Sequence, residues 1–177
     1  IARFGDDVIA FAKDPMAIMK KLEKNYMMKG VGKPQYYLGG DVVDLQELWD
    51  KEGIYTAFSA ETYVKNALPH LAQMCNLVEF RKVKTPFAED YHPELELSDL
   101  LSPPDISKYK SLIGSGNWLI TLGRFDIQYA ISSLAQYSMA PRRGHMTQLQ
   151  RVFGYLAKYP SGMIPIDVAI PKIHKEA

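Results

Sequence analysis

The sequence predicts an α+β fold, in which short strands dominate the first part and helices dominate the second. Three observations support this prediction. Short apolar runs separated by glycine-containing turns lie near the start of the chain, which is typical of strands. An amphipathic helical pattern interrupts these runs. After a long proline-rich and acidic segment, three apolar stripes recur at helical spacing, as in a small helix bundle.

The first elements are a predicted β-hairpin and a helix. Over Ile1 to Ala12, an apolar run follows Gly5–Asp7, which indicates a strand, a tight turn and a second strand. Asp14 then supplies a helix cap and Pro15 a first helical position. Apolar residues at helical spacing extend this amphipathic helix to Gly30, with a lysine-rich outer face.

The next segment carries aromatic and aliphatic residues that suit strands. We expect one strand over residues 35–43, with Gly39 and Gly40 marking a bulge or a close backbone approach. Residues 54–58 are its expected partner, across a turn at residues 51–53. The first part is therefore expected to contain antiparallel strands.

A second helix is expected from Ser59 to Cys75. Ser59 is its expected N-cap, and Cys75 is expected on its apolar face. Pro69 removes a backbone hydrogen bond within it, so a kink or a restart is expected there. Residues 76–106 combine prolines with acidic residues and show little periodicity, which indicates a long connector between two subdomains.

Three helical stripes follow the connector, and they predict a small bundle. Gly114 and Gly116 are expected to let one helix backbone approach another closely. The tail begins a strand at residues 163–168. The apolar positions of the stripes are Tyr109, Leu112, Ile113, Gly116, Leu119 and Ile120, then Ile127, Ala130, Ile131 and Leu134, then Leu149, Val152, Phe153 and Leu156.

Composition narrows the class of protein. The net charge is +1, so any attraction to nucleic acid has to come from local basic patches. A single cysteine, Cys75, rules out an internal disulfide framework and fits a reducing, intracellular compartment. No apolar run reaches the length of a membrane span, and neither an initiator methionine nor a signal-peptide pattern is present. We expect an excised or truncated segment of a longer protein.

Asp6 and Asp7 are the first candidate site. Two adjacent carboxylates on a turn between apolar strands repel each other unless cations neutralise them, and a divalent metal site resolves this repulsion. Phosphoryl transfer by the two-metal route needs carboxylates that hold two Mg²⁺ ions about 4 Å apart. A solvated turn without a metal is the alternative interpretation of the same pair.

Basic residues near the last helix are the second candidate. Contact with duplex phosphates and a plain solvated face both remain open for them, and an open helix N-terminus suits an anion. For the lysines of the first helix a solvated face is favoured. Arg124 and Asp126 are expected to cap and pair, and Cys75 is expected in the core. The basic residues of the last helix are Arg142, Arg143, His145 and Arg151, and the lysines are Lys20, Lys21, Lys24 and Lys29.

Several short motifs follow one another in order from Phe4 to about Tyr159. They are Phe4-Gly5-Asp6-Asp7, Lys29-Gly30-Val31-Gly32, Tyr36-Tyr37-Leu38-Gly39, Ser59-Ala60-Glu61-Thr62-Tyr63-Val64, Val83-Lys84-Thr85-Pro86, Tyr109-Lys110-Ser111-Leu112-Ile113-Gly114-Ser115, Thr121-Leu122-Gly123-Arg124-Phe125-Asp126-Ile127, Pro141-Arg142-Arg143-Gly144-His145 and Arg151-Val152-Phe153-Gly154-Tyr155-Leu156. Each motif is weak alone, but their collinear order is specific, and together they resemble copia-type retrotransposon reverse transcriptases. The sequence departs from that family at Phe4, where tyrosine is usual, at Gly5, where a small aliphatic residue is usual, and at Phe125, where proline is usual.

The resemblance implies a partial palm (β-hairpin, helix and antiparallel strands) followed by a helical thumb. It divides the chain into the C-terminal part of the palm (residues 1–75), a connector (76–106), the thumb (107–160) and the start of a following segment (161–177). A third catalytic carboxylate and the nucleotide-binding fingers are expected upstream of Ile1, so the isolated chain is expected to be inactive.

The resemblance also implies roles for particular residues. Asp6 and Asp7 are the expected catalytic residues and ligands of Mg²⁺ or Mn²⁺. Arg142, Arg143, His145 and Arg151 are the expected nucleic-acid contacts of the thumb. The expected support of the primer strand is Tyr36, Tyr37, Leu38, Gly39 and Gly40.

The expected partners are an RNA or DNA template-primer duplex, deoxynucleoside triphosphates and the remaining polyprotein domains, with no membrane. The expected location is the cytoplasm, including virus-like particles. Two rival interpretations remain open: a non-catalytic domesticated fragment that binds nucleic acid or protein, and an α+β domain whose Asp6-Asp7 pair is only a turn.

Overall fold

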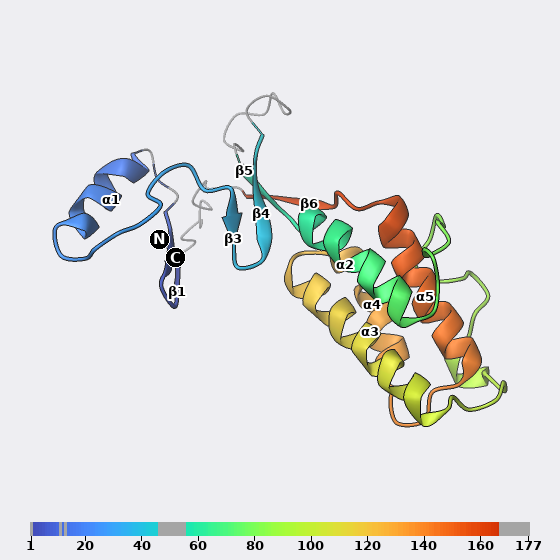
Figure 1. Ribbon diagram of the computed structural model, residues 1–177. Helices are drawn as coiled ribbons and strands as arrows, with labels where there is room; N and C mark the ends of the chain where they lie inside the picture. The colour runs from blue at the N-terminus through green and yellow to red at the C-terminus, as the bar shows by residue number, and fades with distance from the viewer. Residues whose placement is uncertain (1, 11, 13, 46–55, 167–177) are drawn as a thin grey trace, which may run out of the picture. The chain divides into compact units, whose positions relative to one another are not determined.

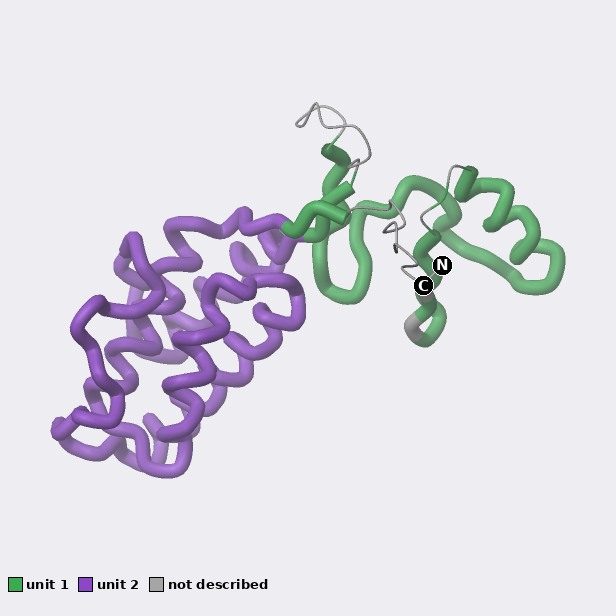
Figure 2. The backbone as a smooth tube through the Cα atoms, turned by 180° about the vertical axis from the view of Figure 1, so that it is seen from behind, with its two compact units in different colours: residues 1–58, 164–177 green, residues 59–163 purple. Residues whose placement is uncertain are grey.

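A computed structural model of the chain describes residues 2–10, 12, 14–45 and 56–166. The chain divides into two compact units, one formed by residues 1–58 and 164–177 and the other by residues 59–163 (Figure 2). Strands and helices are both present, so the predicted α+β class is confirmed. Within the part of the chain that the structure describes, no helix is both long and apolar enough to cross a membrane.

The first unit begins with the predicted hairpin, whose antiparallel strands are β1 (Ala2–Phe4) and β2 (Asp7–Ile9) (Figure 1). Helix α1 (Pro15–Glu23) follows, and the Asp14 side chain accepts a hydrogen bond from the Ala17 amide at 3.0 Å, as the capping prediction requires. The prediction that this helix reaches Gly30 is wrong. None of its residues is buried, so packing does not stabilise a further turn beyond Glu23.

The second part of this unit is a sheet with the strand order β3–β4–β5–β6, formed by Tyr36–Tyr37, Gly40–Asp44, Thr56–Ser59 and Met163–Ile166. The single strand expected over residues 35–43 is wrong, because Leu38 and Gly39 form a turn between β3 and β4. Both turn residues have positive φ, 50° and 86°, which is the backbone of a two-residue hairpin turn. Gly40 lies against the Phe58 ring, so the expected close approach is confirmed there.

The expected partner strand and tail strand are both found in the described part of the sheet. β5 lies next to β4, as predicted, although residues 51–55 of the expected turn and strand lie outside the described residues. β6 matches the start of the expected tail strand, and the residues after Ile166 also lie outside the described part.

Helices dominate the second unit. They are α2 (Glu61–Met74), α3 (Pro103–Thr121), α4 (Gln128–Ala135) and α5 (Arg143–Lys158), with short 3₁₀ helices η1 (Pro93–Leu95) and η2 (Phe125–Ile127). The three predicted stripes are confirmed as α3, α4 with η2, and α5, and α2 packs with α3 and α5. The core residues of these helices include Tyr109, Leu112, Leu119, Ile131, Leu134, Leu149, Val152, Phe153 and Leu156.

Three local predictions for this unit are wrong in whole or in part. Ala60 is the N-cap of α2, while the Ser59 hydroxyl accepts the Glu61 amide at 3.2 Å and donates to the Gly162 carbonyl at 3.0 Å. α2 continues through Pro69, so the expected restart is wrong, and the alternative of a kink stays a prediction. Gly116 packs against Ile131 as expected, but Gly114 faces open space and permits no close approach.

The predicted connector runs along α5 in the described structure (Figure 1). Phe80 is buried and stacks on Phe153 of α5, with ring centroids 5.4 Å apart. The Val83 amide donates to the Gly154 carbonyl at 3.4 Å. Gly154 lies so close to the Arg81 carbonyl that a β-carbon at this position would collide with it. The connector is therefore part of the helical unit's packing, which periodicity alone does not reveal.

Candidate functional site

The Asp6-Asp7 pair stands at the tip of the first hairpin. Phe4 pairs with Asp7 across the two strands, which leaves Gly5 and Asp6 as a two-residue turn. Gly5 has a φ of +56° at the first turn position, as a type II′ turn requires. Asp6 therefore lies in the turn and Asp7 begins β2, and both side chains are exposed. The two carboxylates are held next to each other in the polypeptide and open to solvent.

Asp6 and Asp7 line a pocket of about 340 Å³ together with Tyr36 and Tyr37. The structure thus brings the predicted catalytic pair and part of the predicted primer support to one hollow of the first unit. Leu38, Gly39 and Gly40 complete the β3–β4 hairpin but are not among the lining residues. Lys29 also lines the pocket and is exposed, so a cation is available beside the two acids.

The donor atoms of Asp6 and Asp7 fit part of a magnesium shell. Mg²⁺ is usually held by one or two carboxylates, with water and substrate phosphates as its other ligands. Within the described ranges, no group of three or more His, Cys, Asp and Glu side chains is placed to hold a metal ion. The pair is therefore a partial ligand set, whose remaining ligands would come from elsewhere.

The expected nucleic-acid contacts on α5 fall into two groups in the structure. His145 is only 2% exposed, and its ring stacks on Tyr137 with centroids 4.3 Å apart. Its Nδ1 accepts the Arg142 amide at 3.0 Å, and its Nε2 lies 3.0 Å from the Pro93 carbonyl. A neutral ring protonated at Nε2 satisfies both contacts. His145 is thus part of the core and is not accessible to a phosphate in this conformation.

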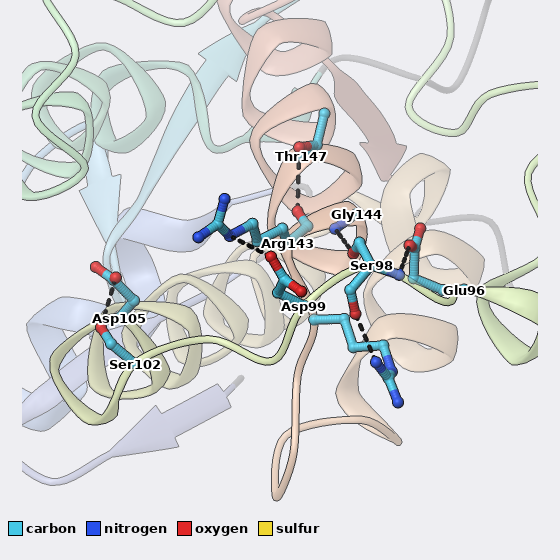
Figure 3. Close-up of polar contacts among 9 residues, drawn as sticks. Glu96, Ser98, Asp99, Ser102, Asp105, Arg143, Gly144 and Thr147 are labelled. Carbon is cyan, nitrogen blue, oxygen red and sulfur yellow. Dashed lines mark hydrogen bonds and ion pairs between the residues drawn. The ribbon is translucent and has the colours of Figure 1, made fainter.

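Residues at the start of α5 are hydrogen-bonded to Ser98 and Asp99 of the connector (Figure 3). The Gly144 amide donates to the Ser98 hydroxyl at 2.9 Å, and the Arg142 guanidinium donates to the Ser98 carbonyl. The Arg143 amide donates to the Asp99 carbonyl at 3.0 Å. These contacts satisfy amides that an α-helix leaves free at its start. The open helix N-terminus considered for an anion is therefore already occupied.

Glu96 adds a carboxylate to this cluster. It accepts the Ser98 amide at 2.9 Å and lies against Gly144, where a side chain would collide with it. The hydrogen bonds from Ser98 lower the pKa of Glu96 below its ordinary value. Sequence reasoning did not single out Glu96 or Ser98. The sequence signal for these two residues is that both side chains can accept hydrogen bonds and that the connector is long enough to reach the start of α5.

The side chains of Arg143 and Arg151 are more accessible to a ligand than that of His145. The Arg143 side chain is largely exposed, and its Nε lies 3.8 Å from the Asp99 carboxylate. Arg151 donates from one terminal nitrogen to the Thr85 hydroxyl at 2.9 Å. The four lysines considered on and after α1, namely Lys20, Lys21, Lys24 and Lys29, are all exposed.

Arg124 and Asp126 pair as predicted. Arg124 is 1% exposed, and its guanidinium makes two hydrogen bonds to the Asp126 carboxylate, of 3.0 and 2.8 Å. A third hydrogen bond, of 3.2 Å, reaches the Pro160 carbonyl. Burial acts to raise the pKa of Asp126, but the hydrogen bonds and charge of Arg124 outweigh it and the pKa is lowered. This pair joins the start of η2 to the segment after α5.

Cys75 is only half-buried at the end of α2, and burial raises the pKa of its thiol. It lines a hollow of about 340 Å³ with Lys108, Arg143 and Gln150. The expectation that Cys75 is a core residue is therefore wrong in degree, since one side of it faces this hollow.

The chain is similar in sequence to proteins encoded by yeast transposons. A transposon Ty5-1 protein of Saccharomyces cerevisiae is 29% identical over 174 residues, which cover 92% of this chain and 52% of that protein. The truncated transposon Ty1-A Gag-Pol polyprotein of the same yeast is 28% identical over 151 residues, which cover 81% of this chain and 12% of the polyprotein. The transposon Ty1-DR5 Gag-Pol polyprotein has the same identity over the same length, which is 8% of its own chain.

These relatives support an origin of the chain in a copia-type retrotransposon. The chain spans about half the length of the Ty5-1 protein and a much smaller share of the Gag-Pol polyproteins. No protein-family model matches the chain. No solved structure matches it either.

Proposed function

We propose that the chain is part of the reverse transcriptase of a copia-type retrotransposon, running from the Asp-Asp hairpin of the palm through the thumb. The observation that carries this proposal is the shared hollow of Asp6, Asp7, Tyr36 and Tyr37, which combines two acids at a tight turn with a second hairpin. The similarity to Ty1 Gag-Pol polyproteins over most of the chain supports the same proposal.

In this proposal Asp6 and Asp7 hold divalent cations, Mg²⁺ or Mn²⁺. When bound, two such ions activate the attacking oxygen and stabilise the leaving oxygen of nucleotidyl transfer. The two carboxylates are adjacent in the backbone, with Asp6 in the two-residue turn and Asp7 at the start of β2. Exposure leaves both carboxylates accessible to solvent, so a triphosphate is able to supply further metal ligands.

The β3–β4 hairpin supports the primer strand in the same proposal. Leu38 and Gly39 form the turn of this hairpin, and Gly40, at the start of its second strand, packs against Phe58. A rigid hairpin beside the two carboxylates would hold the end of a primer in one place, which lowers the entropic cost of reaction. In the proposed thumb, Arg143 on α5 is an exposed cation and Arg151 on the same helix is partly exposed.

The test uses a complete, active parent protein that contains this chain. Replacing Asp6 or Asp7 by Asn keeps the side-chain shape and removes one charge, so we expect primer extension to fall by orders of magnitude with little change in thermal stability. Asp90→Asn is the matched control, since Asp90 is an exposed acid of the connector. Extension at the wild-type rate by either hairpin variant would remove the metal-ligand assignment.

A further inference from the structure

The connector carries a run of cations that the proposed polymerase chemistry does not use. Arg81, Lys82 and Lys84 are all exposed, and no acidic residue lies between Arg81 and Phe87. With a net charge of +1 for the whole chain, a local run of three cations is a marked concentration of charge. The acids Glu79 and Glu89 flank the run in sequence, so its length is limited.

This cationic segment is fixed to a rigid support. The buried ring of Phe80 anchors its start on Phe153, and the Val83 amide bonds to the Gly154 carbonyl of α5. Arg151 of α5 donates to the Thr85 hydroxyl at 2.9 Å. Because the backbone is held in place, a ligand that binds these cations orders only their side chains, which reduces the entropic cost of binding.

A hollow of about 360 Å³ lies where the segment meets α5. Arg81, Val83, Gln148 and Arg151 are among its lining residues. The Nε of Arg151 and the Oε1 of Gln148 are buried and have no hydrogen-bond partner among the described residues. An unpaired buried donor is costly, and a ligand oxygen would satisfy it. Glu79 also lines the hollow, so the charged residues around the hollow are not all cations.

Aromatic rings lie at the other end of the segment. Phe87 contacts Tyr129 of α4 edge to face, with ring centroids 5.7 Å apart. Tyr129 is nevertheless 73% exposed, and Phe125, four residues earlier, is 60% exposed. Exposed aromatic rings together with cations are the combination that binds single-stranded nucleic acid, through base stacking and phosphate contacts.

We propose that Arg81, Lys82, Lys84, Phe87 and Tyr129, here called the connector face, bind a short single-stranded stretch of nucleic acid. The cations contact its phosphates, and an unpaired base stacks on Tyr129. Paired bases of a duplex are already stacked on their neighbours, so the rings favour a single strand. This inference rests on the proposed function, and it adds to that function a site for template or product outside the duplex.

The first test is the salt dependence of binding by the 177-residue chain to a fluorescein-labelled single-stranded RNA of 12 nucleotides. We expect weak, sequence-tolerant binding whose log–log salt slope becomes shallower by about 2 in the triple variant Arg81→Gln, Lys82→Gln, Lys84→Gln, from about 0.7 per lost contact. The triple variant Lys20→Gln, Lys21→Gln, Lys24→Gln is the matched control, because it removes the same charge from exposed residues of the other unit. Equal slopes in the two variants would overturn the proposal.

The second test separates stacking from charge. Tyr129→Ala is expected to weaken single-strand binding by about 5- to 150-fold, and Tyr129→Trp to retain it, since one base–aromatic stack is worth roughly that factor. The Trp variant should also show fluorescence quenching when RNA binds. Equal binding by the Ala and Trp variants, with circular dichroism spectra like that of the wild type, would overturn the stacking role and favour a protein partner for the rings.

Failure of this inference is distinguishable from failure of the proposed function. Binding by the chain alone requires neither metal nor catalysis, whereas the Asp6 and Asp7 variants are scored by primer extension in the complete protein. Unchanged binding in the connector variants leaves the Asp6 and Asp7 result untouched. Wild-type extension by Asp6→Asn would remove the metal-ligand assignment, and it would leave the single-strand binding proposal to be decided by the salt slopes.

Discussion

At the scale of single residues, Arg124 and Asp126 show how a buried charge is retained. The guanidinium is almost fully buried, so removing its partner leaves an uncompensated cation. We expect Asp126→Asn to lower the free energy of unfolding by about 1–3 kcal/mol, less than the roughly 3–5 kcal/mol of a fully buried pair, because 37% of the Asp126 side chain is exposed. Chemical denaturation followed by circular dichroism measures this change.

The same pair predicts a dependence on pH. The native pKa of Asp126 is lowered, so the ionised carboxylate stabilises the fold above the unfolded-state pKa of about 3.9, and this contribution is lost as the pH falls through the native pKa. The stability difference between wild type and Asp126→Asn should therefore be constant near neutral pH and shrink as the pH falls below about 4. Asp99→Asn is the control, since Asp99 is 81% exposed and should give no such difference. An Asp126 difference that stays constant below about pH 4 would contradict the pairing argument.

Gly5 also acts at this scale. Its φ of +56° is a conformation that costs residues with a β-carbon about 1 kcal/mol or more. The glycine that departs from the family pattern is thus the residue that this turn requires. Gly5 favours the type II′ turn that places Asp6 in the loop and Asp7 at the start of β2.

At the scale of elements, two helical glycines provide a test of how the connector packs. Gly154 of α5 faces the Arg81 carbonyl, where a β-carbon would force the backbone to move, whereas Gly114 of α3 faces open space. Helix propensity alone favours alanine by about 1 kcal/mol at either position. We expect Gly114→Ala to stabilise the chain and Gly154→Ala to destabilise it by about 1–3 kcal/mol, through overpacking.

Thermal and chemical unfolding of both variants would measure the difference, with propensity cancelling between them. Gly154→Ala should also increase proteolysis within residues 81–87, because the clash displaces the connector from α5. Similar stabilisation by both alanines would mean that the connector is not packed on α5 as described.

Elements with strong local signals were predictable from the sequence, and elements that depend on packing were not. The Asp14-Pro15 start of α1 and the apolar stripes of α3, α4 and α5 follow from capping and periodicity. The end of α1 was missed because it depends on burial that is absent among its residues. The Leu38-Gly39 turn was missed because leucine rarely adopts positive φ, so no turn signal preceded the glycine.

The candidate site was predictable to a similar extent. Adjacent acids after a glycine indicate a turn, and the sequence indicates a strand segment at Tyr36, but only the fold brings both to one hollow. The role of His145 was missed because a histidine among arginines looks like a surface residue, while its two ring nitrogens are both satisfied inside the unit. Charge in sequence therefore does not reveal which basic residues are accessible.

At the scale of the whole molecule, the two compact units correspond to two kinds of organisation. The first unit holds the hairpins and the Asp6-Asp7 hollow, and the second holds the helices and the connector face. The palm, connector and thumb boundaries expected at residues 75 and 106 remain predictions about the complete protein, since compactness does not identify a functional subdomain. α2 packs with α3 and α5 and so belongs to the helical unit, whereas the expected boundary at residue 75 assigns it to the palm.

The last prediction concerns catalysis by the 177-residue chain alone. Two-metal transfer requires ligands that fix both ions and a pocket that aligns the triphosphate with the primer end, and misalignment by about 1 Å costs about 100-fold in rate. Asp6 and Asp7 are exposed at a hairpin tip and supply only part of such a ligand set. The resemblance to reverse transcriptases implies that the third carboxylate and the nucleotide pocket are not among the residues of this chain. We therefore expect no template-dependent incorporation by this chain with either Mg²⁺ or Mn²⁺, measured with labelled nucleotide on a primed homopolymer. The complete parent protein should extend the same primer under the same conditions, and circular dichroism would show that the chain is folded. Incorporation by the chain that disappears in Asp6→Asn would instead show that the described residues already hold a complete active site.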